Sequence, residues 1–457
     1  MGLISSYFNQ RVSSSPLSLF RFCFGFLMCF SLIRFWNKGW IEELYLDPFF
    51  HFSYYGFDWI KPIGEYTYFI FLICFISSLF VCVGFKYRFS IVVFFFSFLY
   101  IEMMDKTTYL NHYYFISVLS FLLIFLPAQA SFSLDNLINR KRYKTIPKWT
   151  IDSIKLLISI VYIYAAIAKI NSDWLLDAMP LQIWISSKHH FPFLGETLFQ
   201  KEWFYYFMSW AGMLYDLLIP FLLFYTRTRL FGFLLVVLFH ALTKLLFPIG
   251  MFPYIMIISA IIFFSPKFHD DIISKISFFL NQIFSYYNVL QNYKINLINH
   301  YNVRKPIIWI LCCFFLFQFL VPFRYVLYPG ELFWHEQGYR FSWRVMLVEK
   351  TGLANFKIVD SDNGSFFYVN NDNFLTSFQE KQMSFQPDMI LEYAHYLGDY
   401  YSSSNDMEVQ VFVDSYVSLN GRKSQRFIKK DVDLYLEKES FRNKTWITEL
   451  SDEITGF

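Results

Sequence analysis

Long apolar runs are the feature of this sequence that most restricts its fold. A helix of about 20 apolar residues can cross a bilayer, and backbone polar groups in lipid must be satisfied within the spanning segment itself. About nine such runs occur, at 17–36, 66–85, 89–104, 111–127, 150–170, 203–225, 229–246, 250–265 and 306–326. They predict a membrane α-helical bundle of about nine transmembrane helices.

The composition supports a membrane protein and excludes several classes of partner. The 457 residues are 56% hydrophobic and only 16% charged, whereas soluble domains carry about 25% charged residues. A net charge of +3 is too weak to indicate a nucleic-acid partner. The cysteines all lie in apolar runs, so we expect neither a disulfide framework nor a metal site. Membrane lipid is the expected surrounding.

Charged residues between the runs predict the orientation of the bundle. Basic residues follow the second, fourth and sixth runs: Lys86, Arg88, Arg140, Lys141, Arg142, Lys144, Lys148, Arg227 and Arg229. The alternate loops are acidic instead. Because short cytoplasmic loops are enriched in lysine and arginine, the N-terminus should be cytoplasmic, and an odd number of spans places the C-terminal tail outside.

The sequence becomes more polar and more strand-like after the last apolar run. Asn-Gly pairs at 363–364 and 420–421 stand between strand-like runs, as in β-hairpins. A segment from Pro387 is typical of a helix that begins with proline. The sequence therefore predicts a transmembrane domain over residues 1–327 and a smaller, extracytoplasmic, mostly-β domain over residues 328–457.

One apolar run contains a lysine near its end. Residues 161–174, VYIYAAIAKINSDW, include the single cation Lys169. Burial among apolar side chains disfavours the charged form of a lysine, and a neutral lysine can act as a base. The alternative is that Lys169 snorkels to the membrane surface. Asp216, inside a later run, is expected to pair within the bundle.

Two other unusual stretches should lie on the same outer face as Lys169. DKTTYLNHYYF (105–115) crowds Asp105, Asn111 and His112 into one short turn. LFPIGMFPY (246–254) breaks a helix at membrane depth, one to two turns after His240. Such breaks are tolerated where they face protein or a cavity. The structural alternatives are an ordinary buried histidine and a tight interhelical turn.

GYRFSWRVM (338–346) is the last unusual stretch, and it also falls on the outer side. Its arginines alternate with Tyr339, Phe341 and Trp343. Arginine at such a place can grip a carboxylate through paired hydrogen bonds, or an aromatic and basic belt can contact lipid headgroups. Four unusual stretches on one face predict a single pocket that opens outward.

These stretches, together with FRFCFGFLM near the N-terminus, resemble the vitamin K-dependent gamma-glutamyl carboxylase family, including its bacterial relatives with the horizontally transferred transmembrane domain. The similarity runs from about residue 15 to about residue 450. It implies gamma-carboxylation of glutamate residues coupled to quinol epoxidation. Reduced vitamin K, of the menaquinol or phylloquinol type, O2 and CO2 are the implied cofactors. A glutamate-containing peptide or protein is the implied substrate.

The resemblance also implies roles for individual residues. Lys169 matches the family's lysine base, and Asn111 and His112 match the pair beside the quinone. His240 matches a histidine just before the helix break, and Tyr339 matches a tyrosine at the mouth of the glutamate and quinone sites. The predicted catalytic residues are thus Lys169, His112 and Asn111, and the predicted substrate- or quinone-binding residues are His240, Tyr339, Arg340, Trp343 and Asp105.

Two alternatives to a carboxylase stay open. The long C-terminal extension of the animal enzymes, which helps to bind the protein substrate, does not follow TWITEL, so one alternative is a quinol-oxidising epoxidase without carboxylation. The other is a non-enzymatic membrane transporter or scaffold with Lys169 and Asp216 as pathway charges. A composition rich in Phe, Ile, Lys and Asn is typical of a low-GC bacterium, which predicts a multi-pass protein of the bacterial inner membrane.

Overall fold

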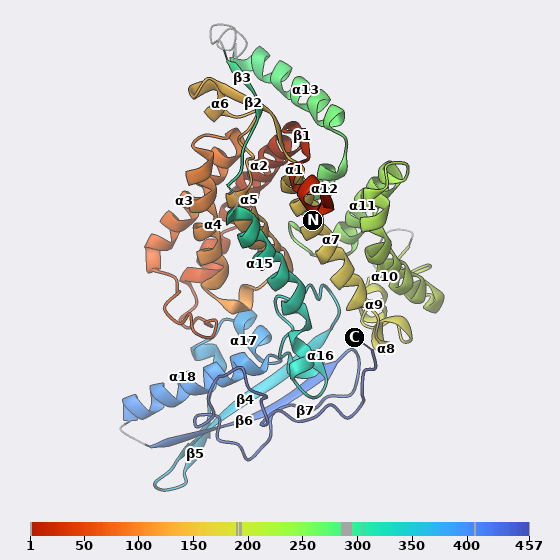
Figure 1. Ribbon diagram of the computed structural model, residues 1–457. Coiled ribbons are helices and arrows are strands. Elements are labelled where there is room, and N and C mark those ends of the chain that lie inside the picture. Colours follow the sequence, from red (N-terminus) through yellow and green to blue (C-terminus); the bar gives the residue numbers. More distant parts are fainter. Residues whose placement is uncertain are drawn as a thin grey trace.

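The computed structural model describes residues 2–188, 191, 194–284, 295–304, 306–405 and 408–456. A helical bundle forms most of the chain, and a region of sheet and helices lies against one end of it (Figure 1). A small three-stranded sheet lies at the opposite end of the bundle. The two ends of the bundle therefore carry different structures.

A helix occurs at each place where the sequence predicts a span. These helices are α2 (Ser15–Asn37), α3 (Thr67–Val83), α4 (Tyr87–Met103), α5 (Asn111–Phe125), α7 (Lys148–Ile167), α10 (Glu202–Phe224), α11 (Arg229–Leu246), α12 (Phe252–Ala260) and α15 (Pro306–Leu320). Within the described residues, 6 helical segments are long and apolar enough to cross a membrane, or up to 7 with one bent pair. The helical bundle is confirmed, whereas the count of nine crossing helices is not.

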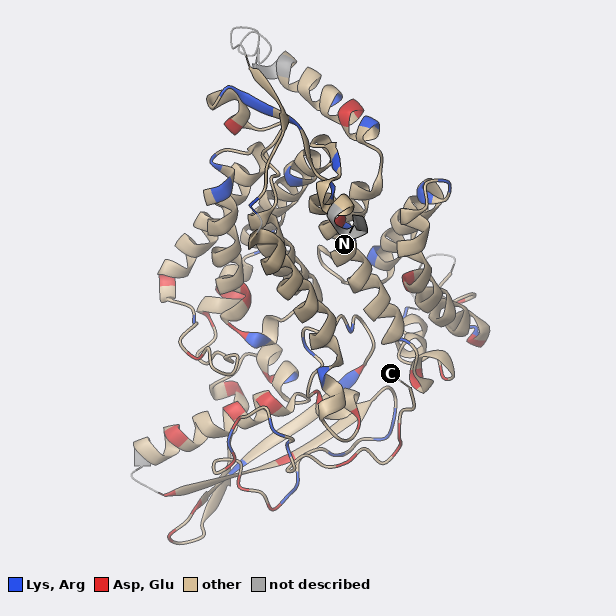
Figure 2. Ribbon diagram, viewed as in Figure 1, with Lys and Arg blue, Asp and Glu red and all other residues tan. Residues whose placement is uncertain are grey.

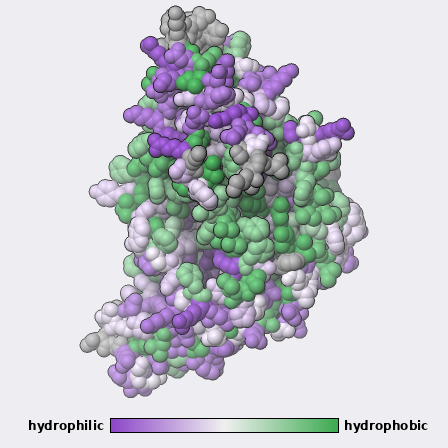
Figure 3. Space-filling model, viewed as in Figure 1, coloured by the Kyte–Doolittle hydropathy of each residue, from purple (hydrophilic) through white to green (hydrophobic). Residues whose placement is uncertain are grey.

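Burial separates a central helix from a peripheral one. In α7, 72% of the apolar window is buried inside the protein, against 17% in the segment that contains α15. Figure 3 shows an apolar band across the helices between two more hydrophilic ends. Exposed side chains such as Phe69, Leu234 and Trp309 contribute to the apolar surface. Such a continuous apolar surface is typical of contact with lipid.

The end that holds the small sheet is rich in basic side chains. Strand β2 (Lys141–Pro147) pairs antiparallel with β1 (Arg11–Ser13) and parallel with β3 (Asn296–His300). Helix α13 (Pro266–Phe284) bends by 120° away from α12 and runs beside this sheet, and α1 (Gly2–Asn9) and α6 (Leu134–Ile138) complete the end. Figure 2 shows lysine and arginine along β2. The sequence from 266 to 305 is mixed in charge and partly amphipathic, and within it residues 285–294 and 305 lie outside the described residues.

The C-terminal region combines a sheet with two helices. Strands β4 (Lys350–Asp360), β5 (Phe366–Tyr368), β6 (Val409–Leu419) and β7 (Gln425–Arg426) are antiparallel in the order β5-β4-β6-β7. Both hairpins turn at the predicted Asn-Gly pairs, and α18 (Pro387–Asn405) begins at the predicted proline. Because α17 (Ser377–Met383) and α18 pack against the sheet (Figure 1), the region is mixed rather than mostly β.

Polar contacts fix the C-terminal region to the end of the bundle. The Arg422 guanidinium donates to both carboxylate oxygens of Asp173 at 2.7 Å, and Asn420 Nδ2 donates to Asp173 Oδ2 at 2.7 Å. On the other side, Gln379 Nε2 donates to Asp105 Oδ2 at 3.0 Å. Paired arginine–carboxylate bonds give a fixed geometry as well as energy. The region is thus held at the ends of both α4 and α7.

Candidate functional site

Lys169 lies just past the end of α7 and is buried in the bundle. Its Nζ is 2.8 Å from Asp216 Oδ2 on α10, and the two side chains are only 7% and 8% exposed. Nζ also donates to the Ala165 carbonyl at 3.2 Å and lies 5.4 Å from the centre of the Trp174 ring. The amine therefore points into protein rather than snorkelling to the surface. The prediction that Asp216 pairs within the bundle is confirmed.

The residues after Lys169 explain why its turn has a fixed shape. Asn171 Nδ2 donates to the Ala168 carbonyl, which closes α7, and Asn171 Oδ1 accepts from Trp174 N, which caps the short helix α8 (Ser172–Leu175). A side-chain cap of this kind satisfies backbone groups that a helix end leaves free. One asparagine thus joins both helices, and the turn between them presents Lys169 to α10.

A small cavity of about 90 Å³ lies beside the Lys169–Asp216 pair. Apolar and aromatic side chains form most of its wall, with His240 as a further polar group. His240 Nε2 lies 3.2 Å from the Tyr162 hydroxyl, and the buried His240 Nδ1 has no hydrogen-bond partner within the described residues. We call this space the Lys169 cavity. It brings together Lys169 and His240 from two of the predicted site stretches.

His112 is separated from the Lys169 cavity by the ring of Phe252. Its imidazole packs against Phe252, with ring centres 6.2 Å apart, and Phe252 in turn lines the cavity. Gly250, which has a φ of +58°, belongs to the predicted helix break, and a Cβ added there would lie 3.4 Å from the His112 ring. Glycine tolerates that left-handed backbone. The break and His112 are therefore adjacent, although His112 does not face Lys169 directly.

Asn111 connects the start of α5 to the 338–346 segment. Its Nδ2 donates to the Arg344 carbonyl at 3.0 Å, and its Oδ1 accepts from the Tyr109 hydroxyl at 3.2 Å. Asp105 lies farther along the same turn, where it accepts from Thr107 N at 2.9 Å and lies 3.3 Å from His51 Nδ1. Both residues hold backbone in place, and neither lines the Lys169 cavity.

The 338–346 segment separates two cavities. Phe341, Trp343 and Met346 have φ values of 59°, 60° and 52°, a backbone that non-glycine residues adopt only at a cost. Trp343 is fully buried against Tyr114, with ring centres 4.7 Å apart. Met346 lines the Lys169 cavity, and Phe341 lines a second, larger one. The single outward pocket that the sequence predicts is therefore divided in two.

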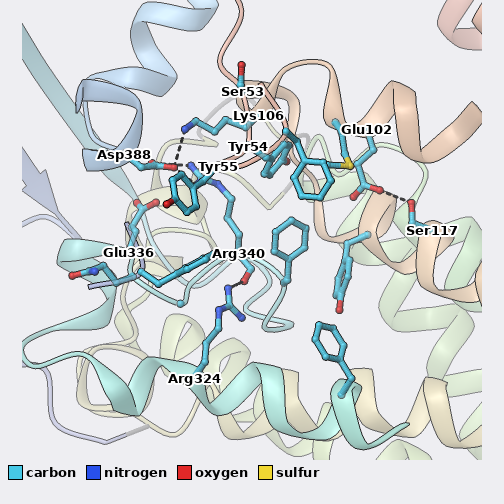
Figure 4. A pocket seen from close by; sticks show the side chains of 18 of the residues that line it. Ser53, Tyr54, Tyr55, Glu102, Lys106, Ser117, Arg324, Glu336, Arg340 and Asp388 are labelled. Carbon is cyan, nitrogen blue, oxygen red and sulfur yellow. Dashed lines mark hydrogen bonds and ion pairs between the residues drawn. The ribbon is translucent and has the colours of Figure 1, made fainter. Parts of the chain in front are cut away.

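The larger cavity has a volume of about 1080 Å³ and lies between α4, α5, α15 and the C-terminal region. Arg340 Nη1 is 2.6 Å from Asp388 Oδ2, and Lys106 Nζ is 3.1 Å from the same oxygen (Figure 4). Lys106 Nζ also lies 2.8 Å from Glu392 Oε2. Arg340 thus grips a carboxylate of the chain itself. Tyr339, the neighbour of Arg340, packs against Phe333 beneath the C-terminal region.

Electrostatics favours the charged forms of Asp388 and Lys106, whereas burial raises the pKa of Glu392 despite its contact with Lys106. Burial alone would raise the pKa of Asp388, but Arg340 and Lys106 outweigh burial and hold it well below its ordinary value. Burial would likewise lower the pKa of Lys106, yet Asp388 and Glu392 raise it. Opposite charges at this distance favour each other's ionised form. The cluster therefore links the turn after α4 to helix α18 through ion pairs.

Sequence reasoning missed the partners in both cavities. Asp216 was recognised as an intramembrane charge, but nothing in the sequence links it to Lys169 on another helix. Lys106 lies inside the DKTTYLNHYYF stretch, and Asp388 follows Pro387. The two residues are far apart in the sequence but form an ion pair in the fold. The unusual stretches around these residues indicated their importance. Which residues pair with each other can be seen only in the folded structure.

The fold and the site define a class of protein, a multi-helix apolar bundle with a buried lysine–aspartate pair beneath a second, mixed region. Residues 9–268 match the family described as HTTM domain, and residues 303–453 match the vitamin K-dependent gamma-carboxylase, lumenal domain. The chain belongs to the vitamin K-dependent gamma-carboxylase family, as the sequence resemblance predicts. The apolar helices and the HTTM match indicate a membrane protein. No solved structure matches the chain significantly.

Proposed function

We propose that this protein catalyses vitamin K hydroquinone-dependent gamma-carboxylation of glutamate residues, coupled to quinol epoxidation. The observation that carries the proposal is the buried Lys169 amine, 2.8 Å from Asp216 in the wall of a cavity. We further propose residues 1–327 as the transmembrane domain of a bacterial inner-membrane protein. Residues 328–457 would then form the extracytoplasmic domain, on the same side as the active site.

The Lys169 cavity suits an apolar ring that carries hydroxyl groups. Met208, Met256 and Met346 line it, together with Trp174 and Phe252. Its volume of about 90 Å³ is below the roughly 300–1,000 Å³ of typical small-molecule sites, so a ring can enter only when these walls move. Methionine side chains adapt readily to a ligand. Reduced vitamin K would supply the electrons for O2 and the strong base that removes a glutamate γ-proton.

The chain's own contribution to the reaction is proton transfer from a phenolic hydroxyl. Lys169 Nζ accepts that proton while the ammonium proton shared with Asp216 moves to Oδ2, so that an ammonium and a neutral carboxylic acid remain. The positive Nζ would then face the oxygen that gave up the proton, and the site as a whole would gain no net charge. A neutral outcome matters because unpaired charge is costly in an apolar surrounding. The proposed base is therefore the Lys169–Asp216 pair.

The other proposed site residues orient the reactants. The unpaired His240 Nδ1 can bond a second hydroxyl of the ring, and His112 supports Phe252 in the cavity wall. Asn111, Trp343 and the neighbouring Tyr339 and Arg340 fix the 338–346 segment, whose far end lines the same cavity. Asp105 fixes the turn before α5. CO2 and a glutamate-containing peptide or protein complete the proposed reaction.

The test uses purified protein in lipid with reduced vitamin K, a glutamate peptide and labelled bicarbonate. Label in the peptide together with vitamin K epoxide is the expected result. Lys169→Ala should lose both products, with partial rescue by added small amines. Lys155→Ala is the matched control, because Lys155 lies on α7, the helix that leads to Lys169, and pairs with Asp152 away from the cavity.

The remaining outcomes separate the alternatives. Epoxide without labelled peptide, across varied peptides, would favour an epoxidase that does not carboxylate. Unchanged quinol in every assay would contradict the proposal and favour a transporter or scaffold. Equal loss in Lys169→Ala and Lys155→Ala would remove the special role of Lys169.

A further inference from the structure

The larger cavity takes no part in the proposed proton transfer, and the part of it that lies between the helices of the bundle is apolar. Three helices form this part, with side chains Phe95, Leu99, Met103, Val118, Phe121, Trp309, Ile310, Cys313, Phe314 and Phe317. Its α15 wall faces the surroundings, since Trp309 is 75% exposed. In the proposed membrane this wall borders lipid, so an apolar chain can reach the cavity without crossing water.

One polar side chain interrupts the apolar part of the larger cavity. Glu102 is only 4% exposed, and its Oε2 accepts a hydrogen bond from the Ser117 hydroxyl (Figure 4). The other oxygen, Oε1, is buried and has no hydrogen-bond partner among the described residues. A buried acceptor without a donor costs free energy. Because Glu102 and Ser117 both line the cavity, a ligand there can supply the missing donor.

The cations around the cavity are already engaged. Arg340 and Lys106 pair with Asp388 and Glu392, and Lys444 pairs with Glu439 at the rim. Arg324 donates to the carbonyls of Val321 and Arg340. Apart from Glu392 Oε2, which pairs with Lys106, three buried atoms of residues that line the cavity lack a hydrogen-bond partner among the described residues: Glu102 Oε1, Tyr54 Oη and His335 Nε2. Of these, Glu102 Oε1 is an acceptor on α4, one of the three helices that form the apolar part. A ligand with a hydroxyl donor therefore fits better than one with an acidic head.

We propose that the larger cavity is a binding site for an amphiphile that carries an apolar chain and a hydroxyl donor. The chain lies among α4, α5 and α15, and the hydroxyl donates to Glu102 Oε1. A volume of about 1080 Å³ is at the upper end of the roughly 300–1,000 Å³ of ordinary ligand sites, as a chain-bearing ligand requires. An isoprenoid quinol and a glyceride with a free hydroxyl share this chemistry.

Two adjacent cysteines on α15 offer a direct probe of occupancy. Cys312 and Cys313 are both free and exposed, but only Cys313 is among the residues that line the cavity. Cys312→Ser leaves Cys313 as reporter, and Cys313→Ser leaves Cys312 as matched control. The rate of alkylation by N-ethylmaleimide, measured by peptide mass spectrometry, is recorded with increasing menaquinol or diacylglycerol under nitrogen. Neither readout depends on carboxylase activity.

The expected result is slower alkylation of Cys313, by several-fold at saturation, with no change at Cys312. Protection by menaquinol identifies the quinol as the source, and protection by diacylglycerol identifies the membrane lipid. Menaquinol with both hydroxyls methylated should need about tenfold more ligand for half protection, because the hydrogen bond to Glu102 is lost. Glu102→Leu should weaken the hydroxyl-bearing ligand by a similar factor and leave the methylated one unchanged.

Four results would overturn the proposal. One is the absence of protection by either ligand, and another is equal protection of both cysteines. The third is equal affinity for the hydroxyl-bearing and the methylated ligand on the otherwise unchanged chain. Leu99→Trp, which fills the apolar part, should abolish protection, and full protection in that variant would also exclude this cavity.

Discussion

The two cavities on either side of the 338–346 segment stabilise buried charge in different ways. In the Lys169 cavity, one lysine faces one aspartate, and each has the other as its ionic partner. At the larger cavity, Lys106 holds two carboxylates and Asp388 holds two cations. An isolated pair can exchange a proton with a ligand, whereas a cluster keeps each charge fixed through several partners. We therefore expect the Lys169–Asp216 pair to take part in the reaction, and the cluster at the larger cavity to attach the C-terminal region to the bundle.

The largest expected effect is on the isolated pair. Asp216→Asn should reduce the rate of epoxide formation by about 10²–10⁴-fold, the usual contribution of a positioned acid–base group. Asp216→Glu should recover part of that rate, because the carboxylate is restored. The measurement is epoxide formed per molecule of folded protein. Full activity in Asp216→Asn would mean that Lys169 acts without its partner.

The cluster should respond through stability instead. Lys106→Met leaves Glu392 without its cation, and removal of one partner from a buried ion pair costs about 3–5 kcal/mol. We expect a lower unfolding midpoint in detergent, with epoxide formation per folded molecule nearly unchanged. Loss of activity at full stability would place Lys106 in the reaction and erase the distinction between the cavities.

The same cluster predicts a dependence of stability on pH. The pKa of Asp388 is depressed in the folded protein, so its contribution is complete above the unfolded pKa of about 3.9. That contribution is lost as the pH falls through the folded value. The stability difference between the wild type and Asp388→Asn should therefore be constant from pH 8 to about 5 and shrink below about pH 4. A difference that changes near neutral pH would contradict the assignment.

The smallest effect is expected at an ion pair far from either cavity. Arg426 lies 3.1 Å from Asp414, with side chains 29% and 37% exposed. Pairs of this kind contribute about 0–1 kcal/mol, so Arg426→Ala should change the unfolding midpoint little. A change as large as that of Lys106→Met would show that the exposure of a pair does not govern its contribution here.

Local patterns predicted much of the fold. The apolar runs placed the helices, and the Asn-Gly pairs placed both hairpin turns, since Asn420 and Gly421 have the positive φ values that such a turn requires. Pro387 marked the start of α18. The number of crossing helices was less certain, because α5 has 15 residues and α12 has 9. Run length alone does not tell a full crossing from a shorter apolar helix.

The parts of the site that depend on long-range pairing could not be predicted. The sequence marked Lys169 and Asp216 separately, but their meeting depends on how α7 packs against α10. The left-handed backbone of Phe341 and Trp343 divides the outer pocket, and residues with large side chains give no sign of such a conformation. The parallel pairing of β3 with β2 joins segments that are far apart in the sequence and likewise had no local signal.

The most direct test of the central assignment is an experimental structure of the protein with reduced vitamin K bound under nitrogen. A hydroxyl of the ring should lie within hydrogen-bond distance of Lys169 Nζ, with Met346 or its neighbours displaced to admit the ring. A ring found only in the larger cavity, with the Lys169–Asp216 pair untouched, would contradict that assignment.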